Sequence, residues 1–338
     1  MQYEDQLKTN AAAMVAKGKG LLAADESAPT IAKRFDSVGV ENTEAKRREY
    51  RQLLLTTEGA EKFISGVILF DETIRQSADD GTAFPEALKA KGIIPGIKVD
   101  MGAKDLALHE GEKVTEGLDG LRERFTEYAA LGAGFAKWRA VITIVGNDLP
   151  SEACISVNAH ALARYAALAQ EAGIVPVIEP EVLLDGDHSI ERCHEVVAQT
   201  LDELFAECEI QGVMLEGMIL KTSMVLSGKE ASTRADVQEV AENTVKCLKE
   251  HVPSALAGVV FLSGGQTDLE ATAHLDAMNK IGGMPWPLSF SYSRAIQSTV
   301  LQLWAKGDQE GAVKAYLKRA EANSLASLGQ WSEEFEKS

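Results

Sequence analysis

The chain has 338 residues, of which 45% are hydrophobic and 25% are charged, and this composition excludes a disordered, collagen-like or coiled-coil protein. Its 34 basic and 51 acidic residues give a net charge of −17. An acidic surface repels phosphate backbones and anionic lipid, so we expect neither a nucleic acid nor a membrane among its partners. An anionic small substrate would need a local cluster of Lys and Arg side chains.

The cysteines and the N-terminus indicate a cytoplasmic protein. The four cysteines are Cys154, Cys193, Cys208 and Cys247. They form no C-x-x-C pair and fall in segments with a helical pattern, which is typical of buried thiols in a reducing compartment. The polar first ten residues do not resemble a signal peptide, and no apolar run approaches the ~20 residues of a membrane span.

Eight short, continuously apolar runs are predicted as strands buried on both faces. They span residues 20–24, 64–70, 95–99, 134–142, 174–178, 212–220, 258–262 and 288–292. Helical patterns lie between them, the clearest after Ser151, which is placed to cap a helix that Gly173 would end. Residues 187–207 and 236–251 are also predicted as helices.

This alternation of strand and helix favours a parallel sheet with crossover helices. Eight units predict an α/β fold of the (β/α)8 TIM barrel type, with an open doubly wound sheet as the alternative. No linker divides the chain, so we expect one barrel domain over residues 1–338. A helical segment of about residues 1–17 would precede the barrel, and a tail of about residues 329–338 would follow it.

Charged or small polar residues stand where most of these runs end. They are Asp25 and Glu26, Lys98 and Asp100, Lys137 and Arg139, Glu179 and Glu181, Glu216 and Lys221, Ser263 to Gly265, and Ser291, Ser293 and Arg294. Burying an unpaired charge costs several kcal/mol, and the carboxyl ends of barrel strands form the active-site face. The set therefore predicts a site, although any single member could belong to a structural ion pair.

Two features of this set suggest particular chemistry. A lysine close to other cations and partly buried is favoured in the neutral form, which can attack a carbonyl and form a Schiff base. Lys221, Lys98 and Lys137 are the three candidates, and their spacing does not choose among them. The Ser263 to Gly265 stretch, with Arg294 on the next strand, suggests a phosphate site, and the alternative for these glycines is a tight turn.

Seven segments resemble one family in sequence and order. They are GKGLLAADES (18–27), GVILF (66–70), GIKVD (96–100), FAKWR (135–139), VIEPE (177–181), LSGGQ (262–266) and FSYSR (290–294). Over about residues 17–330 the chain resembles class I fructose-bisphosphate aldolase. The resemblance implies the reversible cleavage of fructose 1,6-bisphosphate to dihydroxyacetone phosphate and glyceraldehyde 3-phosphate in glycolysis and gluconeogenesis, without a metal or other cofactor. It also implies a homo-oligomer, usually a tetramer.

The resemblance also implies roles for individual residues. Lys221 would form the Schiff base, Glu179 would act as general acid and base, Asp25 would take the proton of the C4 hydroxyl, and Lys137 would stabilise charge. Glu181 would hold Lys221 and Lys137 in place. The remaining substrate- and phosphate-binding residues would be Ser27, Thr30, Arg34, Lys98, Arg139, Ser263, Gly264, Gly265, Ser291 and Arg294.

The chain departs from the family's pattern in several places. Ala28, Pro29 and Thr30 follow the Asp-Glu-Ser motif where animal members have Thr-Gly-Ser, and Ser293 stands where a glycine is usual. Thr222 and Ser223 replace Pro-Asn. The chain also ends without the tyrosine that assists proton exchange in animal members, so exchange is expected to depend less on its tail.

Two other functions fit a barrel with these charges. An isomerase acting on a phosphorylated sugar would move protons with its carboxylates and need no covalent lysine adduct. A binding or scaffold module would use no catalytic group, but buried charges without a function are costly to keep.

Overall fold

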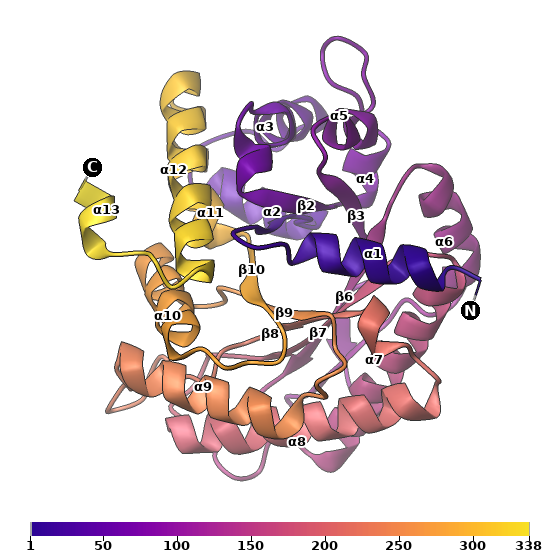
Figure 1. Ribbon diagram of the computed structural model, residues 1–338, viewed down its shortest axis with the longest axis vertical. Coiled ribbons are helices and arrows are strands. Elements are labelled where there is room, and N and C mark those ends of the chain that lie inside the picture. Colours follow the sequence, from indigo (N-terminus) through magenta and orange to yellow (C-terminus); the bar gives the residue numbers. More distant parts are fainter. Residues whose placement is uncertain (1, 338) are drawn as a thin grey trace.

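The computed structural model describes residues 2–337 and consists of a closed, all-parallel, eight-stranded barrel inside a ring of helices (Figure 1). The strands of the barrel are β1 Gly20–Ala24, β2 Ile64–Leu69, β3 Ile94–Lys98, β6 Phe135–Ile142, β7 Val175–Val182, β8 Ile219–Thr222, β9 Gly258–Phe261 and β10 Leu288–Tyr292. β1 pairs with both β2 and β10, which closes the sheet. The predicted (β/α)8 barrel is thus confirmed, and the open doubly wound sheet is excluded.

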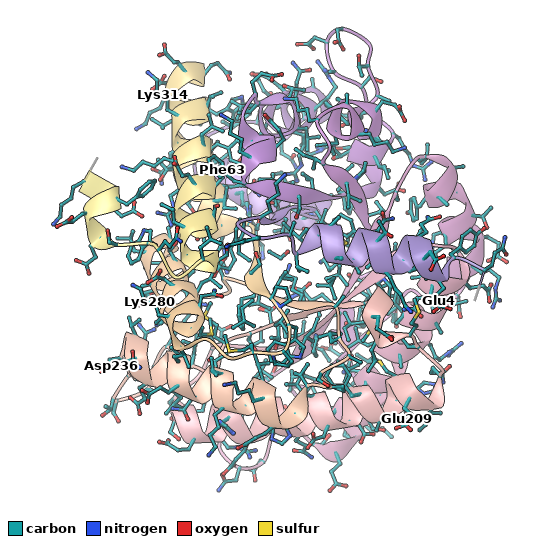
Figure 2. The ribbon with its side chains drawn as sticks, viewed as in Figure 1. Glu4, Phe63, Glu209, Asp236, Lys280 and Lys314 are labelled. Carbon is teal, nitrogen blue, oxygen red and sulfur yellow. The ribbon has the colours of Figure 1, made fainter. Side chains whose placement is uncertain are left out.

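Helices cover the outside of the barrel and extend it at both ends of the chain. They are α1 Glu4–Met14, α2 Ala28–Asp36, α3 Glu44–Thr56, α4 Asp71–Ile74, α5 Phe84–Ala90, α6 Leu121–Ala130, α7 Glu152–Glu171, α8 Ile190–Ile210, α9 Val237–His251, α10 Asp268–Ile281, α11 Arg294–Ala305, α12 Gln309–Ser327 and α13 Glu333–Lys337. Charged side chains such as Glu209 and Lys314 lie on their exposed faces, and Asp236 caps the start of α9 (Figure 2). No helix within residues 2–337 has the length and apolarity needed to cross a membrane.

Local sequence signals explain where these elements begin and end. The Ser151 hydroxyl accepts a hydrogen bond from the backbone N–H of Cys154 at 3.1 Å, so it caps α7 as predicted. Gly173 follows that helix with φ = +73°, a conformation that glycine adopts without steric cost. Every residue of β1 and of β7 is buried, as expected for strands covered on both faces.

The N-terminal helix α1 closes one end of the barrel (Figure 1). Leu7, Ala11 and Met14 pack with strand residues that include Val175 and Ile219, and all five are fully buried. This packing seals the end of the barrel where the strands begin. The opposite end, where the strands finish, is left for the polar residues of the site.

Two local predictions were wrong, and one short element was not predicted. The run 212–220 is a strand only near its end, because Leu215–Gly217 forms a 3-10 turn before β8. Glu216 lies in that turn and is exposed, so it is not a strand-end charge at the barrel mouth. A short antiparallel hairpin, β4 Ala103–Asp105 with β5 Lys113–Thr115, was not predicted.

Candidate active site

A cavity of about 550 Å³ opens where the barrel strands end. Its lining comes from α2, from the ends of β6, β7, β8 and β10, from the segment after β9 and from the start of α11. The lining residues are Pro29, Thr30, Lys33, Arg34, Ser37, Arg139, Glu179, Glu181, Lys221, Leu262, Ser263, Gly264, Ser291, Ser293 and Arg294. Ten of the fifteen site residues predicted from the sequence belong to this lining.

A buried chain of alternating charges lies at the base of the cavity. Lys221 Nζ on β8 is 3.0 Å from Glu179 Oε1 on β7. The other oxygen of Glu179 is 3.3 Å from Lys137 Nζ on β6, and Lys137 Nζ is 2.7 Å from Asp25 Oδ2, just after β1. The four residues expected to do the chemistry therefore form one connected network, although Asp25 and Lys137 lie behind the lining rather than in it.

The cations of this network keep its carboxyl groups ionised. Burial opposes ionisation of Asp25, but Lys137 and Lys221 outweigh it and hold the pKa of Asp25 well below its usual range. The same competition between burial and the two lysines lowers the pKa of Glu179. Burial disfavours the charged form of Lys137, but Asp25 and Glu179 raise the pKa of this lysine above its usual value. Both carboxylates can therefore accept a proton at neutral pH.

Glu181 has a different partner from the one expected. Its carboxylate forms an ion pair with Arg139 Nε, and no ion pair joins it to Lys221 or Lys137 among residues 2–337. Glu179 contacts both lysines instead. The expectation that Glu181 holds Lys221 and Lys137 is therefore wrong. The register of β6 and β7 gives the reason for Lys137, because this lysine is level with Val177, four residues before Glu181.

One side of the cavity has the features of an anion site. It includes Ser263 and Gly264 after β9, Ser291 on β10, and Arg294, where α11 begins. The Ser291 hydroxyl is buried and has no hydrogen-bond partner in the described part of the chain. The cavity therefore meets the positive end of the α11 dipole, an arrangement that favours a bound anion.

A side chain at position 264 would crowd two neighbouring side chains. A Cβ added there would lie 2.8 Å from Glu181 Oε1 and 2.9 Å from a methyl carbon of Leu262. A larger side chain would therefore push against the carboxylate that holds Arg139, and it would narrow the cavity.

A second group of polar side chains comes from one face of α2. Thr30, Lys33, Arg34 and Ser37 all line the cavity and are spaced i, i+3, i+4 and i+7. Lys33 and Ser37 were not predicted as site residues. The helical spacing from Thr30 and Arg34 was the signal that could have found them, once this segment was recognised as a helix.

A buried carboxylate fixes one of these cations. Glu26, two residues after the end of β1, pairs with the Arg34 guanidinium and with Arg51 Nη2 at 2.5 Å. Ser293 accepts a hydrogen bond from Arg34 at 3.1 Å and donates one to Glu26 at 2.8 Å. Ser293 replaces the usual glycine, and its hydroxyl therefore helps to orient Arg34.

Besides Asp25 and Lys137, three predicted residues lie outside the lining. Lys98 Nζ is 2.5 Å from Asp100 Oδ1. The Ser27 hydroxyl is 3.1 Å from that of Thr30. Gly265 has φ = +78° and packs against Leu184, so it shapes the loop after β9 without facing the cavity.

The lining contains five cations, Lys33, Arg34, Arg139, Lys221 and Arg294, against the two carboxylates Glu179 and Glu181. This local excess of positive charge can bind an anionic substrate within a protein whose net charge is −17. A barrel with a buried lysine paired to a carboxylate, beneath an anion pocket, has the groups that imine chemistry on a phosphorylated carbonyl compound requires. The fold and the site together thus define an enzyme of the Schiff-base type.

Comparisons with known proteins identify the family. Residues 6–338 match the family model described as fructose-bisphosphate aldolase class-I. The chain is 60% identical over 330 residues to a probable fructose-bisphosphate aldolase class 1 of Xanthomonas campestris pv. campestris, covering 97% of this chain and 98% of that protein. It is 48% identical to the cytosolic fructose-bisphosphate aldolase 4 of Arabidopsis thaliana, covering 96% and 83%.

A solved structure agrees with these matches. The fructose-bisphosphate aldolase of Plasmodium falciparum, solved in complex with TRAP and a small-molecule inhibitor, superimposes with a TM-score of 0.96 at 46% identity, covering 98% of this chain and 96% of that one. The chain belongs to the class I fructose-bisphosphate aldolase family and is a carbon–carbon lyase.

Proposed function

We propose that this enzyme catalyses the reversible cleavage of fructose 1,6-bisphosphate to dihydroxyacetone phosphate and glyceraldehyde 3-phosphate through a Schiff base on Lys221. The observation that carries the proposal is the 3.0 Å contact between Lys221 Nζ and Glu179 Oε1 in the wall of a cation-lined cavity. Of the three candidate lysines, Lys221 lines the cavity, whereas Lys98 is tied to Asp100 and Lys137 lies between Asp25 and Glu179.

Imine formation requires that a proton leave the Lys221 ammonium and that a proton later be donated to the C2 hydroxyl. Glu179 is placed for both steps. It accepts a proton from the Lys221 ammonium, and the neutral amine attacks the C2 ketone to give a carbinolamine. The protonated Glu179 then donates that proton to the C2 hydroxyl, which leaves as water. The products of this step are a protonated imine and the original Glu179 carboxylate, so the protons balance.

Carbon–carbon cleavage uses Asp25 as the base. The Asp25 carboxylate takes the proton of the C4 hydroxyl, the C3–C4 bond breaks, and its electron pair moves into the protonated imine to form an enamine. Glyceraldehyde 3-phosphate leaves as the aldehyde. Protonation of the enamine at C3 and hydrolysis of the imine then release dihydroxyacetone phosphate. Lys137 holds the Asp25 and Glu179 carboxylates in place through its ion pairs with both.

The two phosphates are assigned to the two cationic sides of the cavity. Ser263, Gly264, Ser291 and Arg294 would bind one, and the α2 face with Arg34 would bind the other. A bisphosphate held at both ends would have its C2 to C4 segment between them, next to Lys221.

Borohydride trapping tests the proposal. The enzyme is incubated with fructose 1,6-bisphosphate in EDTA, reduced with borohydride and mapped by peptide mass spectrometry. We expect one stable adduct on Lys221, which Lys221→Ala removes together with activity. An adduct on Lys98 or Lys137 would show that the nucleophile is that lysine instead of Lys221. Activity that survives Lys221→Ala would favour the alternative of a sugar-phosphate isomerase without a covalent adduct. Failure to trap an adduct, with cleavage lost in EDTA, would contradict the mechanism.

The cellular setting is proposed on the same basis. We infer a cytoplasmic enzyme of glycolysis and gluconeogenesis, supported by the resemblance to the cytosolic plant aldolase. We also infer a homo-oligomer, with a tetramer favoured by the family. Light scattering on the purified protein gives the subunit number, and a monomeric mass would contradict the inference.

A further inference from the structure

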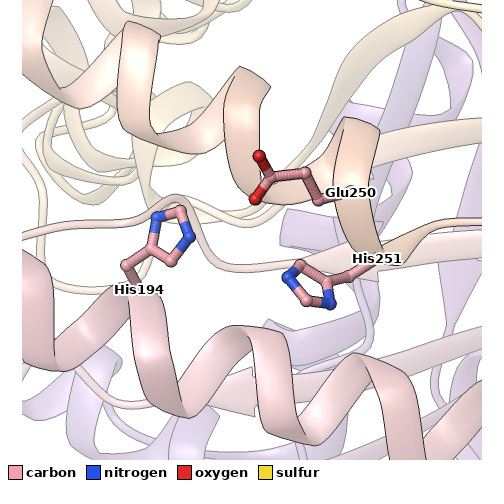
Figure 3. A group of neighbouring side chains, drawn as sticks. All are labelled: His194, Glu250 and His251. Atoms are coloured by element: carbon pink, nitrogen blue, oxygen red, sulfur yellow. The ribbon is translucent and has the colours of Figure 1, made fainter.

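Two outer helices bring together a group of metal-ligating side chains away from the cavity. His194 is on α8, and Glu250 and His251 are at the end of α9. One ligand atom from each lies within 4.8 Å of the other two. Figure 3 shows the two imidazole rings and the carboxylate arranged around one gap between the helices. None of these residues lines the cavity described above.

The spacing suits a small divalent ion after a modest side-chain movement. Zinc binds His nitrogen and carboxylate oxygen at ~2.0 to 2.2 Å, and tetrahedral coordination then separates the ligand atoms by about 3.3 Å. The ligand atoms would have to approach one another by about 1.5 Å at most, since they lie within 4.8 Å. Rotation of the half-buried His194 and the exposed Glu250 side chains can supply this movement.

A further residue prepares His251 for binding. Its Nδ1 is 2.8 Å from Asp202 Oδ1 on α8, which leaves Nε2 for a ligand. A carboxylate on the second ring nitrogen fixes the tautomer and orientation of a metal-binding histidine and raises its basicity. This contact distinguishes the group from a chance cluster of surface side chains.

The surrounding charges and thiols do not prevent cation binding. The charged groups close to His194 include Lys246, which opposes a bound cation, and Glu250, which favours one. Cys193 and Cys247 lie on the same helices, but both are buried and neither belongs to the group of neighbouring ligand atoms.

We propose that His194, Glu250 and His251 form a site for a divalent transition-metal ion, with zinc as the ion that best fits these ligands. Two imidazoles and a carboxylate are a ligand set typical of zinc, and water would complete the tetrahedron. The bound ion cross-links α8 and α9. Its effect is on the stability of this part of the helical ring, and the retro-aldol chemistry does not use it.

Calorimetric titration with zinc chloride tests the site. The EDTA-treated and dialysed full chain is titrated at pH 7.5 in a buffer that does not bind zinc, beside a variant with His194→Ala and His251→Ala. A matched control carries His109→Ala and His160→Ala, which removes one partly exposed and one exposed histidine elsewhere. We expect one zinc per chain in the wild type and the control, and affinity at least tenfold weaker in the first variant.

Further measurements separate a ligand role from a structural one. Asp202→Asn should weaken zinc binding by about 10- to 100-fold, as loss of such a supporting carboxylate does elsewhere. Saturating zinc should raise the melting temperature of the wild type but not that of the variant lacking His194 and His251. If that variant does not fold, Glu250→Gln, at an exposed position, gives the same comparison. No binding to the wild type at 1 mM zinc, or equal affinity in both double variants, would overturn the proposal.

Discussion

Replacing Lys137 with methionine should move the acid limb of the activity profile. Lys137 Nζ lies 2.7 Å from Asp25 and 3.3 Å from Glu179, and all three side chains are nearly excluded from solvent. Methionine keeps most of the side-chain volume and removes the charge. Both carboxylates then lose a cation that keeps their pKa values low.

The size of the effect follows from these distances. The Coulomb attraction at 2.7 Å is about 6 kcal/mol at an effective dielectric constant of 20, and desolvation offsets most of it. An opposite charge this close lowers a carboxyl pKa by about 1–3 units, or about 1.4–4 kcal/mol. A carboxyl whose pKa is depressed is active above that pKa, so losing the cation moves the loss of activity to higher pH. The acid limb of the kcat/KM profile should therefore shift to higher pH by about 1–3 units.

The assay is the pH dependence of kcat/KM for fructose 1,6-bisphosphate cleavage, measured with a coupled dehydrogenase. The control is Lys113→Met, which removes an exposed lysine paired with Asp105 and should leave the profile unchanged. Thermal unfolding of both variants confirms that each is folded at the assay temperature. An acid limb that stays in place while kcat/KM falls would refute the assignment of this limb to the Asp25 and Glu179 carboxylates.

Three further predictions concern the rim and the tail. Gly264→Ala should raise KM at least tenfold by pushing against Glu181, and an unchanged KM would contradict the packing argument. Arg294→Ala should raise KM by about tenfold or more with a smaller change in kcat, since a charge-assisted hydrogen bond contributes about 1.5–3 kcal/mol, and steady-state kinetics separates the two constants. Removing residues 331–338 should leave cleavage within a few-fold but lower the melting temperature by calorimetry, because Trp331 is only 7% exposed and its backbone N–H donates a hydrogen bond to Asp276 on α10. A collapse of hydrogen–tritium exchange on bound dihydroxyacetone phosphate after this truncation would show that the tail does act in that step.

The tail illustrates what could not be predicted from its sequence. It lacks a tyrosine, which suggested independence from the active site, but its actual position depends on distant partners. Glu336 pairs with Arg319 on α12 at 2.7 Å, and the Trp331 backbone N–H donates to Asp276 at 2.9 Å. Contacts between residues so far apart in sequence leave no local pattern, so only the folded chain shows where the tail docks.

Local signals were sufficient for most of the barrel. Buried parallel strands are continuously apolar, and a cap such as Ser151 marks a helix start through its own hydrogen bond, so both can be read over a few residues. The same reasoning failed at residues 212–220, where an apolar run contains a 3-10 turn before β8. An apolar pattern reports burial, and it does not separate a strand from a buried turn.

The sequence by itself determined the barrel, the strand ends that carry charge, and through its motifs the family. The tertiary structure decided which charges meet. Three lysines were equal candidates by spacing. The neighbouring strands β7 and β8 bring Lys221 to Glu179, and Lys137 on β6 reaches both Glu179 on β7 and Asp25 after β1, whereas Lys98 pairs with Asp100 only two residues along the chain. The reason is physical: a strand's pattern fixes the face on which a side chain lies, whereas its partner is fixed by the closure of the sheet, which joins residues from opposite ends of the chain.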